Sequence, residues 1–289
     1  MLLLEGISNI YKIKILVENC MSSLEKWQID NDKNGWQSPI AFSNDNVVRK
    51  KLPPLQFGNY ERKFNVSLRN TGHTVQLDLD TTDIDCDDLP VVSGGPLEFD
   101  YTLDHIHFHW DVEHTIDGHK YPLEAHLVHY KTSTGSFRNA LKFNDGLAIL
   151  AVFYDYGNCK ENIFKEFVQG IEDVSRNVSC GVPVDGICFC GFLPNYVKSY
   201  YTYQGTFNAP GIHEVATWVV FSEPATIEKS QLEALSNIDT EENDHPPQKS
   251  SPVQEMNDPS IIYNGNFYAA VRKFIRDTRR YIWEAKGDN

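Results

Sequence analysis

Three histidines alternate with large apolar residues in the segment 105–110 (HIHFHW). Side chains two residues apart on a β-strand point to the same face, so His105, His107 and His109 are predicted to form a row on one side of a strand. Each buried imidazole needs partners for two ring nitrogens, which an ordinary core rarely supplies three times over. A metal site therefore accounts for the row better than a histidine-rich core does.

A second alternating segment, 123–130 (LEAHLVHY), carries two more histidines. Glu124 and His126 fall on one face of this predicted strand, and His129 falls on the other. If the two strands pair through the polar connection at 111–120, His126 meets the first row. Three imidazoles from two adjacent strands would leave one position of a tetrahedral ion open, as in a catalytic zinc site. The spacing leaves open which two histidines of the first row would bind.

The elements that must position these residues are mostly strands. Residues 62–69 and 74–80 alternate apolar and polar side chains on either side of Asn70-Thr71-Gly72, which is typical of a strand, a turn and a second strand. Further patterns predict buried strands at 147–154 and 214–221 and short helices at 160–172 and 227–235. The chain is therefore predicted to form one mainly β domain with short helices.

Composition and charge exclude several kinds of binding site. The 289 residues are 41% hydrophobic, enough for one sizeable core, and the net charge of -14 argues against binding to nucleic acid. The six cysteines contain no CxxC pair, so we expect buried thiols instead of a cysteine zinc site, with Cys188 and Cys190 on one face of a strand. Six aspartates in 78–88 predict an exposed, solvated loop, a calcium site being the weaker alternative.

The two ends differ from the middle of the chain. Residues 1–26 form a divergent segment whose apolar stretch is too interrupted by charges to predict a signal peptide or a membrane span. Polar residues and prolines are frequent in 236–260, and we place a linker at 248–265, after a main domain at 27–247. Residues 266–286 predict an amphipathic basic helix, docked on the acidic domain or, alternatively, in weak contact with a membrane or another protein.

Several short motifs accompany the histidine segments between residues 27 and 247. They are Gln37-Ser38-Pro39-Ile40, Asn70-Thr71-Gly72-His73, Ser93-Gly94-Gly95-Pro96-Leu97, Phe108-His109-Trp110, Glu113-His114-Thr115, Glu124-Ala125-His126-Leu127-Val128-His129 and Tyr203-Gln204-Gly205. With this spacing, the chain resembles the α-carbonic anhydrase family. The resemblance implies a single domain with a twisted, mostly antiparallel central sheet around a conical zinc cleft.

The resemblance also implies roles for the histidines that the spacing left open. The zinc ligands would be His107, His109 and His126. His105 stands where the family usually has a glutamine that hydrogen-bonds the first ligand, and Glu124 stands where the family orients the third. Both would act by fixing the tautomer and ring direction of a ligand.

The reaction implied by the resemblance is the reversible hydration of carbon dioxide to bicarbonate and a proton by zinc-bound hydroxide. His73 matches the family's proton shuttle, a role that suits histidine because its ordinary pKa is near neutrality. Phe207 stands in place of a usual leucine and Ala216 in place of a usual valine. The positions that match the family's apolar pocket for carbon dioxide are Val128, Ile149, Phe207, Ala216 and Trp218.

The sharpest departure from the family is Asn208-Ala209, where two threonines usually stand beside the substrate. The first threonine accepts a hydrogen bond from the zinc-bound hydroxide and donates one to a glutamate, here Glu113. The amide of Asn208 can accept and donate in the same way, and its backbone N–H remains available to bicarbonate, but the side chain is longer. Because misplacing an orienting group by about 1 Å can cost on the order of 100-fold, we expect a reduced rate.

Three hypotheses for the function follow from these motifs. The first is a zinc-dependent carbonic anhydrase. The second is a carbonic-anhydrase-related protein that keeps zinc and serves as a binding module, and the third is a zinc esterase or related hydrolase. Members that have lost catalysis usually lose zinc histidines, whereas this chain keeps all three, which favours the enzyme.

The location of the protein is predicted from a position that carries a cysteine in many secreted members. Val215 occupies that position here, so the disulfide of those members cannot form. We therefore expect a cytoplasmic protein, or a secreted one if the N-terminus is incomplete, and we expect a monomer.

Overall fold

The computed structural model describes residues 38–43, 45–110, 114–157, 162–175, 181–209, 212–238 and 261–265, without the side chains of Asn208, Ala209 and residues 212–215. The predicted N-terminal segment at 1–26 and the predicted basic helix at 266–286 lie outside the described residues.

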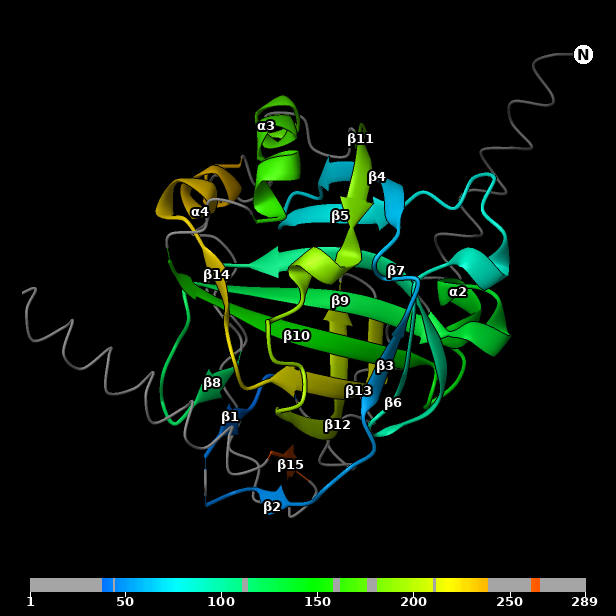
Figure 1. The fold of residues 1–289 in the computed structure, drawn as a ribbon, viewed down its shortest axis with the longest axis vertical. Coiled ribbons are helices and arrows are strands. Elements are labelled where there is room, and N and C mark those ends of the chain that lie inside the picture. Colours follow the sequence, from blue (N-terminus) through cyan, green and yellow to red (C-terminus); the bar gives the residue numbers. More distant parts are fainter. Residues whose placement is uncertain are drawn as a thin grey trace, which may run out of the picture.

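A large mixed sheet of 13 strands forms the body of one domain (Figure 1). Its strands run in the order β11-β4-β5-β7-β9-β10-β13-β12-β15-β2, with β3, β6 and β14 paired off this path. The remaining two strands, β1 and β8, form a separate two-stranded parallel sheet. The strands of the domain are β1 (Ala41–Phe42), β2 (Val48–Arg49), β3 (Leu55–Gly58), β4 (Lys63–Asn70), β5 (Val75–Leu79), β6 (Val91–Gly94), β7 (Leu97–His109), β8 (Thr115–Ile116), β9 (Leu123–Lys131), β10 (Leu147–Tyr156), β11 (Gly181–Cys188), β12 (Tyr200–Ala209), β13 (Ile212–Phe221), β14 (Ala225–Ile227) and β15 (Ile262–Asn264).

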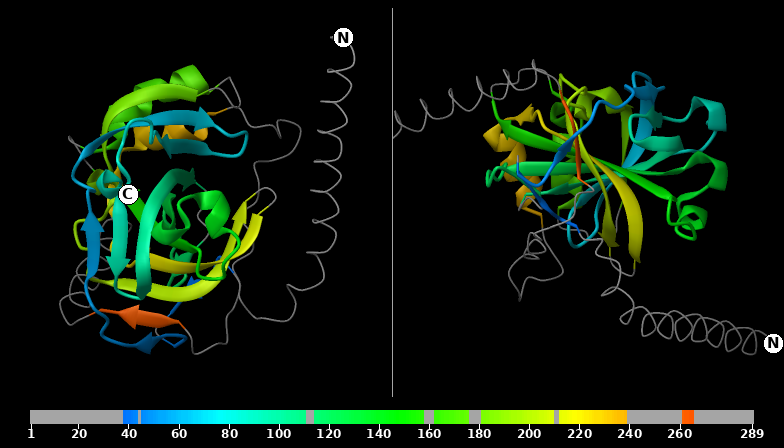
Figure 2. Two further views of the ribbon diagram at one scale, coloured as in Figure 1. Left: turned by 90° about the vertical axis from the view of Figure 1, so that its right-hand side faces the viewer. Right: turned by 90° about the horizontal axis from the view of Figure 1, so that it is seen from below.

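Most neighbouring strands in this sheet are antiparallel, and β10 pairs in parallel with β13. The strands fan out across the sheet when the molecule is seen from below (Figure 2). The helices are short: α2 (Phe137–Ala140), α3 (Phe164–Val174), α4 (Lys229–Ser236), and the 3-10 helices η1 (Cys86–Asp88), η2 (Thr132–Thr134) and η3 (Phe189–Phe192). The predicted fold class, a mainly β single domain with a mostly antiparallel sheet, is confirmed.

Local sequence explains the outer strands. β4 alternates exposed and buried residues, as expected for a strand with one face on a core, and it pairs antiparallel with β5. The turn between them is closed by Asn70, whose Oδ1 accepts a hydrogen bond from the N–H of Gly72 at 2.9 Å. Gly72 has a φ of 84°, a conformation that glycine adopts without steric cost. The strand–turn–strand unit predicted from this segment is therefore present.

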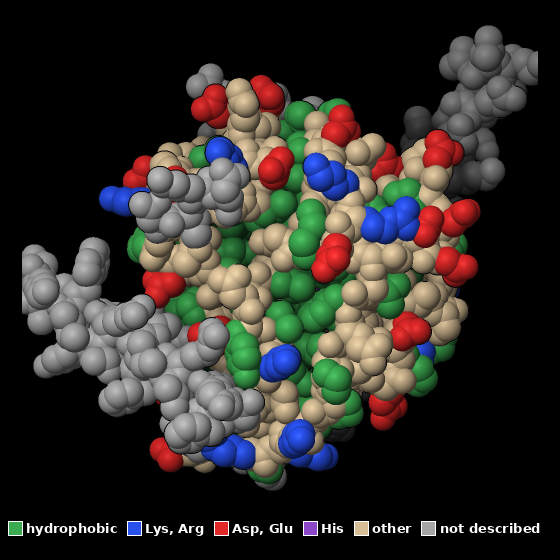
Figure 3. Space-filling view, viewed as in Figure 1, with side chains coloured by type: hydrophobic (Ala, Val, Ile, Leu, Met, Phe, Trp, Pro, Cys, Tyr) green, Lys and Arg blue, Asp and Glu red, His purple; other side chains and the backbone are tan. Residues whose placement is uncertain are grey.

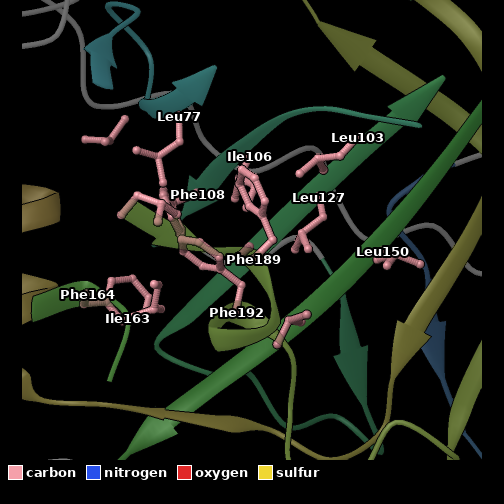
Figure 4. Packing of buried hydrophobic residues seen from close by; sticks show 14 of the residues in the cluster. Leu77, Leu103, Ile106, Phe108, Leu127, Leu150, Ile163, Phe164, Phe189 and Phe192 are labelled. Carbon is pink, nitrogen blue, oxygen red and sulfur yellow. The ribbon is translucent and has the colours of Figure 1, made fainter. Parts of the chain in front are cut away.

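The central strands β7, β9 and β10 bury both of their faces, and each face packs into a different hydrophobic cluster. One cluster contains Ile106, Phe108, Leu127 and Leu150, and it is filled on its far side by α3 and η3. Figure 4 shows these residues packed with Phe164, Phe189 and Phe192. We call this side of the central strands the apolar face. The opposite side, which we call the site face, carries the histidine row and a second cluster.

Helix α3 forms for the reason that its sequence suggests. Its buried residues, Phe164, Phe167, Ile171 and Val174, recur every three to four positions and therefore make one stripe. The shorter α4 begins with a capping box, in which Glu228 and Gln231 each bond the backbone of the other's position. Helices close to both predicted ranges are thus present. Within the described residues, no helix is long and apolar enough to span a membrane.

Two expectations need correction. Cys188 ends β11, whereas Cys190 lies in η3 and is exposed, so the two do not lie as buried thiols on one strand; Cys86 is exposed as well. The chain leaves the extended conformation at Phe189, which strand periodicity does not signal. The linker expected at 248–265 ends in β15, whose residues pair with β12 and β2. Short strands at the edge of a sheet carry little pattern of their own.

The aspartate-rich segment 78–88 is exposed over most of its length, as predicted. Two of its aspartates form ion pairs: Asp78 with Arg69 across β4 and β5, and Asp88 with Arg62. Elsewhere, acidic and basic side chains are interspersed with apolar ones on the face seen in Figure 3. The charge of the described surface on this side is therefore mixed.

Candidate metal centre

The register of β7 against β9 brings the two histidine segments together. The strands pair antiparallel with His107 opposite His126 and His109 opposite Glu124. One ring nitrogen from each of His107, His109 and His126 lies within 4.8 Å of the other two. These three imidazoles therefore converge on one small region of the site face, where they could hold a metal ion.

His105 belongs to the same row but not to this cluster. Its ring lies 5.3 Å from that of His107, and its Nδ1 lies 2.8 Å from Oδ2 of Asp104. The register shifts by one residue between Leu103 and His105, so that Asp104 is the extra residue of a β-bulge. Because of this shift Leu103 packs on the apolar face although His105, two residues later, lies on the site face. The bulge thus sets where the histidine row begins.

Glu124 is completely buried and holds two histidines at once. Its Oε1 lies 2.8 Å from Nε2 of His126 and 2.6 Å from Nδ1 of His114, and its Oε2 accepts the backbone N–H of His114 at 3.1 Å. Burial by itself would raise the pKa of Glu124, but the charges and hydrogen bonds of His114 and His126 outweigh it and hold that pKa well below its usual range. Since an ionised carboxylate can only accept, the facing nitrogens donate.

This assignment decides which nitrogen of His126 can face a metal. Nε2 donates to Glu124, so Nδ1 is left for the cluster with His107 and His109. At His107, burial and then the neighbouring rings of His109, His126 and His105 lower the pKa well below its ordinary value, so the imidazole is neutral. Neutral imidazoles are the form that binds zinc, and three of them with one open position match a catalytic zinc site. The donor set therefore fits zinc.

A chain of hydrogen bonds extends from this centre to residues that sequence reasoning did not assign. His114 Nε2 lies 2.7 Å from the hydroxyl of Tyr203, which in turn lies 2.8 Å from Oγ of Ser38. His114 and Tyr203 lie in matched motifs, as does Ser38, but no spacing along the chain connects them. Tyr203 lies on β12, which is separated in the sheet from β9, the strand of His126, by β13 and β10. Only the assembled sheet therefore brings these residues together. Through His114, this chain helps to hold the carboxylate of Glu124 that also binds His126.

His73 lies in the turn between β4 and β5, close to the histidine strand. The next residue, Thr74, donates its hydroxyl to the carbonyl oxygen of Phe108 at 2.5 Å and accepts the N–H of Phe108 at 3.2 Å. Phe108 stands between His107 and His109, so this clamp attaches the turn directly to that strand. His73 itself is partly exposed. The turn therefore lies at the border between the site face and solvent.

The five residues matched to the apolar pocket lie together in the structure. All are buried and belong to the cluster on the site face: Val128, Ile149, Phe207, Ala216 and Trp218. Ile149 is paired with Val128 on one side and with Trp218 on the other. The Trp218 ring lies 4.9 Å from that of His126, and the Phe207 ring lies 6.2 Å from that of His107. An apolar wall thus adjoins the histidine cluster.

Three of the predicted site residues have no described side chain. Glu113 lies outside the described residues. Asn208 and Ala209 end β12, where their backbones pair with His213 and Ile212, but their side chains are not described. Phe207, the residue before them, lies beside His107, so the end of β12 approaches the site face.

Comparison with known proteins agrees with this arrangement. The model of the eukaryotic-type carbonic anhydrase family matches residues 22–265. Carbonic anhydrase 7 of Mus musculus is 37% identical over 214 residues, which cover 70% of this chain and 76% of that protein. The mitochondrial carbonic anhydrase 5A of Homo sapiens is 32% identical over 212 residues, 70% of this chain and 66% of that protein, and human carbonic anhydrase 3 is 29% identical over 229 residues, 75% and 83% of the two chains. With this fold, this cluster and these relatives, the chain belongs to the eukaryotic-type carbonic anhydrase family.

Proposed function

We propose that this protein binds one zinc ion through His107, His109 and His126 and interconverts carbon dioxide and bicarbonate. The observation that carries the proposal is the convergence of three imidazole nitrogens within 4.8 Å, next to an apolar wall. Zinc in such a site supplies a Lewis acid that makes water a nucleophile at neutral pH. The names of the related proteins support the same reaction.

The residues around the cluster would each have a separate task. Glu124 would hold His126 in the tautomer that leaves Nδ1 free for the metal, since its Oε1 accepts a hydrogen bond from the N–H at Nε2. The wall that includes Val128 and Ile149 offers carbon dioxide an apolar surface beside the histidine cluster. His73, at the solvent border, would carry the product proton away. His105 would support His107, whose ring it contacts.

Metal analysis beside a hydration assay tests the proposal. The purified chain is expected to contain one zinc per molecule and to hydrate carbon dioxide in stopped-flow measurements, to lose activity on treatment with a chelator and to regain it when zinc is added. A chain without zinc, or one in which added zinc restores no activity, would contradict the proposal.

Asn208 favours a second candidate, a binding module that keeps zinc but has lost turnover. Asparagine stands where the family aims the attacking oxygen, and we propose that it lowers the rate without abolishing it. Zinc at full occupancy with no hydration, and with sulfonamide binding retained, would instead favour the binding module.

The substitution Asn208→Thr separates these readings. It is expected to raise kcat/KM by up to about 100-fold, because a shorter hydroxyl restores the usual position of the orienting group. Stopped-flow hydration at equal zinc content measures the change. Ala209→Thr is the matched control and should raise the rate less, since the resemblance assigns the orienting bond to the first of the two threonines. If Asn208→Thr is no faster than the natural chain, Asn208 does not limit the reaction.

A further inference from the structure

The carboxylate of Asp104 contacts the ring of the next residue in the chain, His105. Its Oδ2 lies 2.8 Å from Nδ1 of that ring. In a regular strand the side chains of neighbouring residues point to opposite faces, which keeps such groups apart. The β-bulge of β7, in which Asp104 is the extra residue, bends the strand and re-aims a side chain. The bulge thus brings a carboxylate to the beginning of the histidine row.

The ring of His105 is also in contact with two other rings. It lies 5.3 Å from the ring of His107 and 5.9 Å from that of Phe137, the first residue of α2. Both separations fall in the range of about 4.5–7 Å in which aromatic rings interact. The side chain of His105 is 10% exposed and that of Asp104 is 33% exposed. His105 is therefore an enclosed ring whose Nδ1 is bound to a carboxylate that still reaches water.

This contact decides where His105 carries its proton. A neutral imidazole has one nitrogen that donates and one that accepts, and either nitrogen can carry the proton. Because a carboxylate has only acceptors, Nδ1 of His105 donates to Asp104. The proton of the neutral ring is then fixed on Nδ1, and Nε2 keeps its lone pair as an acceptor.

The tautomer of His105 matters because of its neighbour His107. The imidazole of His107 is neutral, so with one nitrogen on a metal it has one N–H left. The remaining N–H of a metal-binding histidine almost always donates to an acceptor. With its proton on Nε2, His105 would offer a second donor on that nitrogen, whereas the tautomer selected by Asp104 offers an acceptor. A histidine in this place can therefore support His107 in one tautomer only.

We propose that Asp104 is a positioning residue of the metal centre: it holds His105 in the Nδ1–H tautomer and so makes Nε2 the acceptor for His107. The inference rests on the proposed function, since it takes His107 as a zinc ligand. No proton is gained or lost in this arrangement, because both imidazoles stay neutral and only the nitrogen that carries the proton is selected. Asp104 acts through His105 and touches neither the metal nor the substrate.

NMR of the full chain labelled with ¹⁵N-histidine tests the tautomer in the zinc-free protein at neutral pH. Correlations between ring protons and ring nitrogens distinguish a protonated nitrogen from a bare one. The signals that are missing from His105→Gln identify His105 among the 10 histidines. The natural chain is expected to show a protonated Nδ1 and a bare Nε2, and Asp104→Ala should move part of the population to the Nε2–H form. A doubly protonated ring, a proton on Nε2 in the natural chain, or an unchanged tautomer in Asp104→Ala overturns the proposal.

Zinc competition with a chromophoric chelator tests the consequence for the metal. Asp104→Ala should weaken zinc binding about 10-fold, at the lower end of the range for supporting residues. In the His105→Gln background the same change should have little effect, because the amide oxygen of glutamine accepts without any tautomer to select. Asp100→Ala is the matched control, since it removes an exposed acidic residue of the same strand, and it should leave the affinity nearly unchanged.

Two results of the zinc measurement would overturn the proposal. Equal losses in Asp104→Ala and Asp100→Ala would mean that negative charge on β7 is sufficient, and equal losses with and without His105 would mean that Asp104 does not act through that ring. A natural chain that binds no zinc contradicts the proposed function and with it the role of Asp104. A chain that binds zinc but keeps the tautomer of His105 in Asp104→Ala contradicts the role of Asp104 alone.

Discussion

The two faces of β7, β9 and β10 belong to the same strands and differ in nearly every property. On the apolar face, Phe108, Leu127 and Leu150 are fully buried in a cluster with α3 and η3. On the site face, the alternate positions carry His107 and His126, which bond to or lie near other polar groups. The difference indicates that packing on one face holds the strands, so that the histidines on the other face are preorganised for a ligand.

Each face has one feature that belongs to the other type. The site face has its own apolar wall, and the apolar face contains His129, which is fully buried and hydrogen-bonded to the hydroxyl of Tyr60. Burial lowers the pKa of His129 to about 3, so this imidazole is neutral. A neutral histidine with a tyrosine partner can be accommodated inside an apolar cluster, whereas a charged one could not.

The largest change in zinc affinity is expected when one of the predicted zinc ligands on the site face is removed. His126→Ala should weaken zinc binding by more than the roughly 10- to 100-fold that loss of a supporting residue causes. Competition with a chromophoric chelator measures the affinity. His105→Ala is the matched control, because His105 lies in the same row but outside the cluster, and its effect should stay within that smaller range. Equal losses in the two variants would mean that the cluster is not the binding site.

The second prediction concerns the residue between two predicted ligands. Phe108→Ala should lower the free energy of unfolding by about 3–5 kcal/mol, because it opens a cavity in the apolar cluster. Denaturant unfolding of the zinc-free protein measures the loss, and the folded fraction should keep its zinc affinity. Phe108→Leu, which keeps most of the volume, is the control and should cost less. If Phe108→Ala unfolded at the same denaturant concentration as the natural chain but bound zinc weakly, the assignment of stability to the apolar face and of zinc binding to the site face would be wrong.

A smaller effect is expected from the carboxylate that orients His126. Glu124→Gln should weaken zinc binding roughly 10- to 100-fold, because the amide has one accepting oxygen in place of two. Its NH₂ group would face either the ring nitrogens of His126 and His114 or the backbone N–H of His114, all of which donate. Zinc competition again provides the measurement. Tyr203→Phe removes a hydroxyl from the far end of the same chain of hydrogen bonds and should have a weaker effect. If Tyr203→Phe weakened zinc binding more than Glu124→Gln, Tyr203 and not Glu124 would be the main support of His126.

Near neutral pH the smallest effect on stability is expected from protonation of the histidine of the apolar face. The folded pKa of His129 is about 3, below the value of about 6.5 in an unfolded chain. Below pH 6.5 the unfolded state therefore takes up a proton that the folded state does not. Stability from this group is complete above that pH and falls as the pH drops towards 3, by up to about 1.4 kcal/mol per pH unit.

The substitution His129→Gln should flatten this dependence while leaving zinc affinity at neutral pH nearly unchanged. Unfolding of the zinc-free protein at several pH values measures the difference between variant and natural chain. Tyr60→Phe is the control, since it removes the hydrogen bond to His129 but keeps the titrating group. Identical slopes for His129→Gln and the natural chain would show that His129 is not buried in its neutral form.

The fold was predictable where the pattern is local and regular. Alternation identified β4, β5, β7 and β9, because side chains on a strand change face at each residue whatever lies further along the chain. The same reasoning failed at Cys190, where the strand had already ended, and at β15, which is too short to carry a pattern. The prediction that His129 faces away from His126 holds in the structure.

By itself the sequence determined that His105, His107 and His109 share one face of their strand. It determined equally that Glu124 and His126 share one face of theirs, since both statements follow from a period of two. It did not decide which nitrogens converge. That depends on the register of β7 against β9 and on the bulge at Asp104, which are set by pairing across strands. Nor could it connect His114 with Tyr203, because strands far apart in the chain become neighbours only when the sheet is assembled.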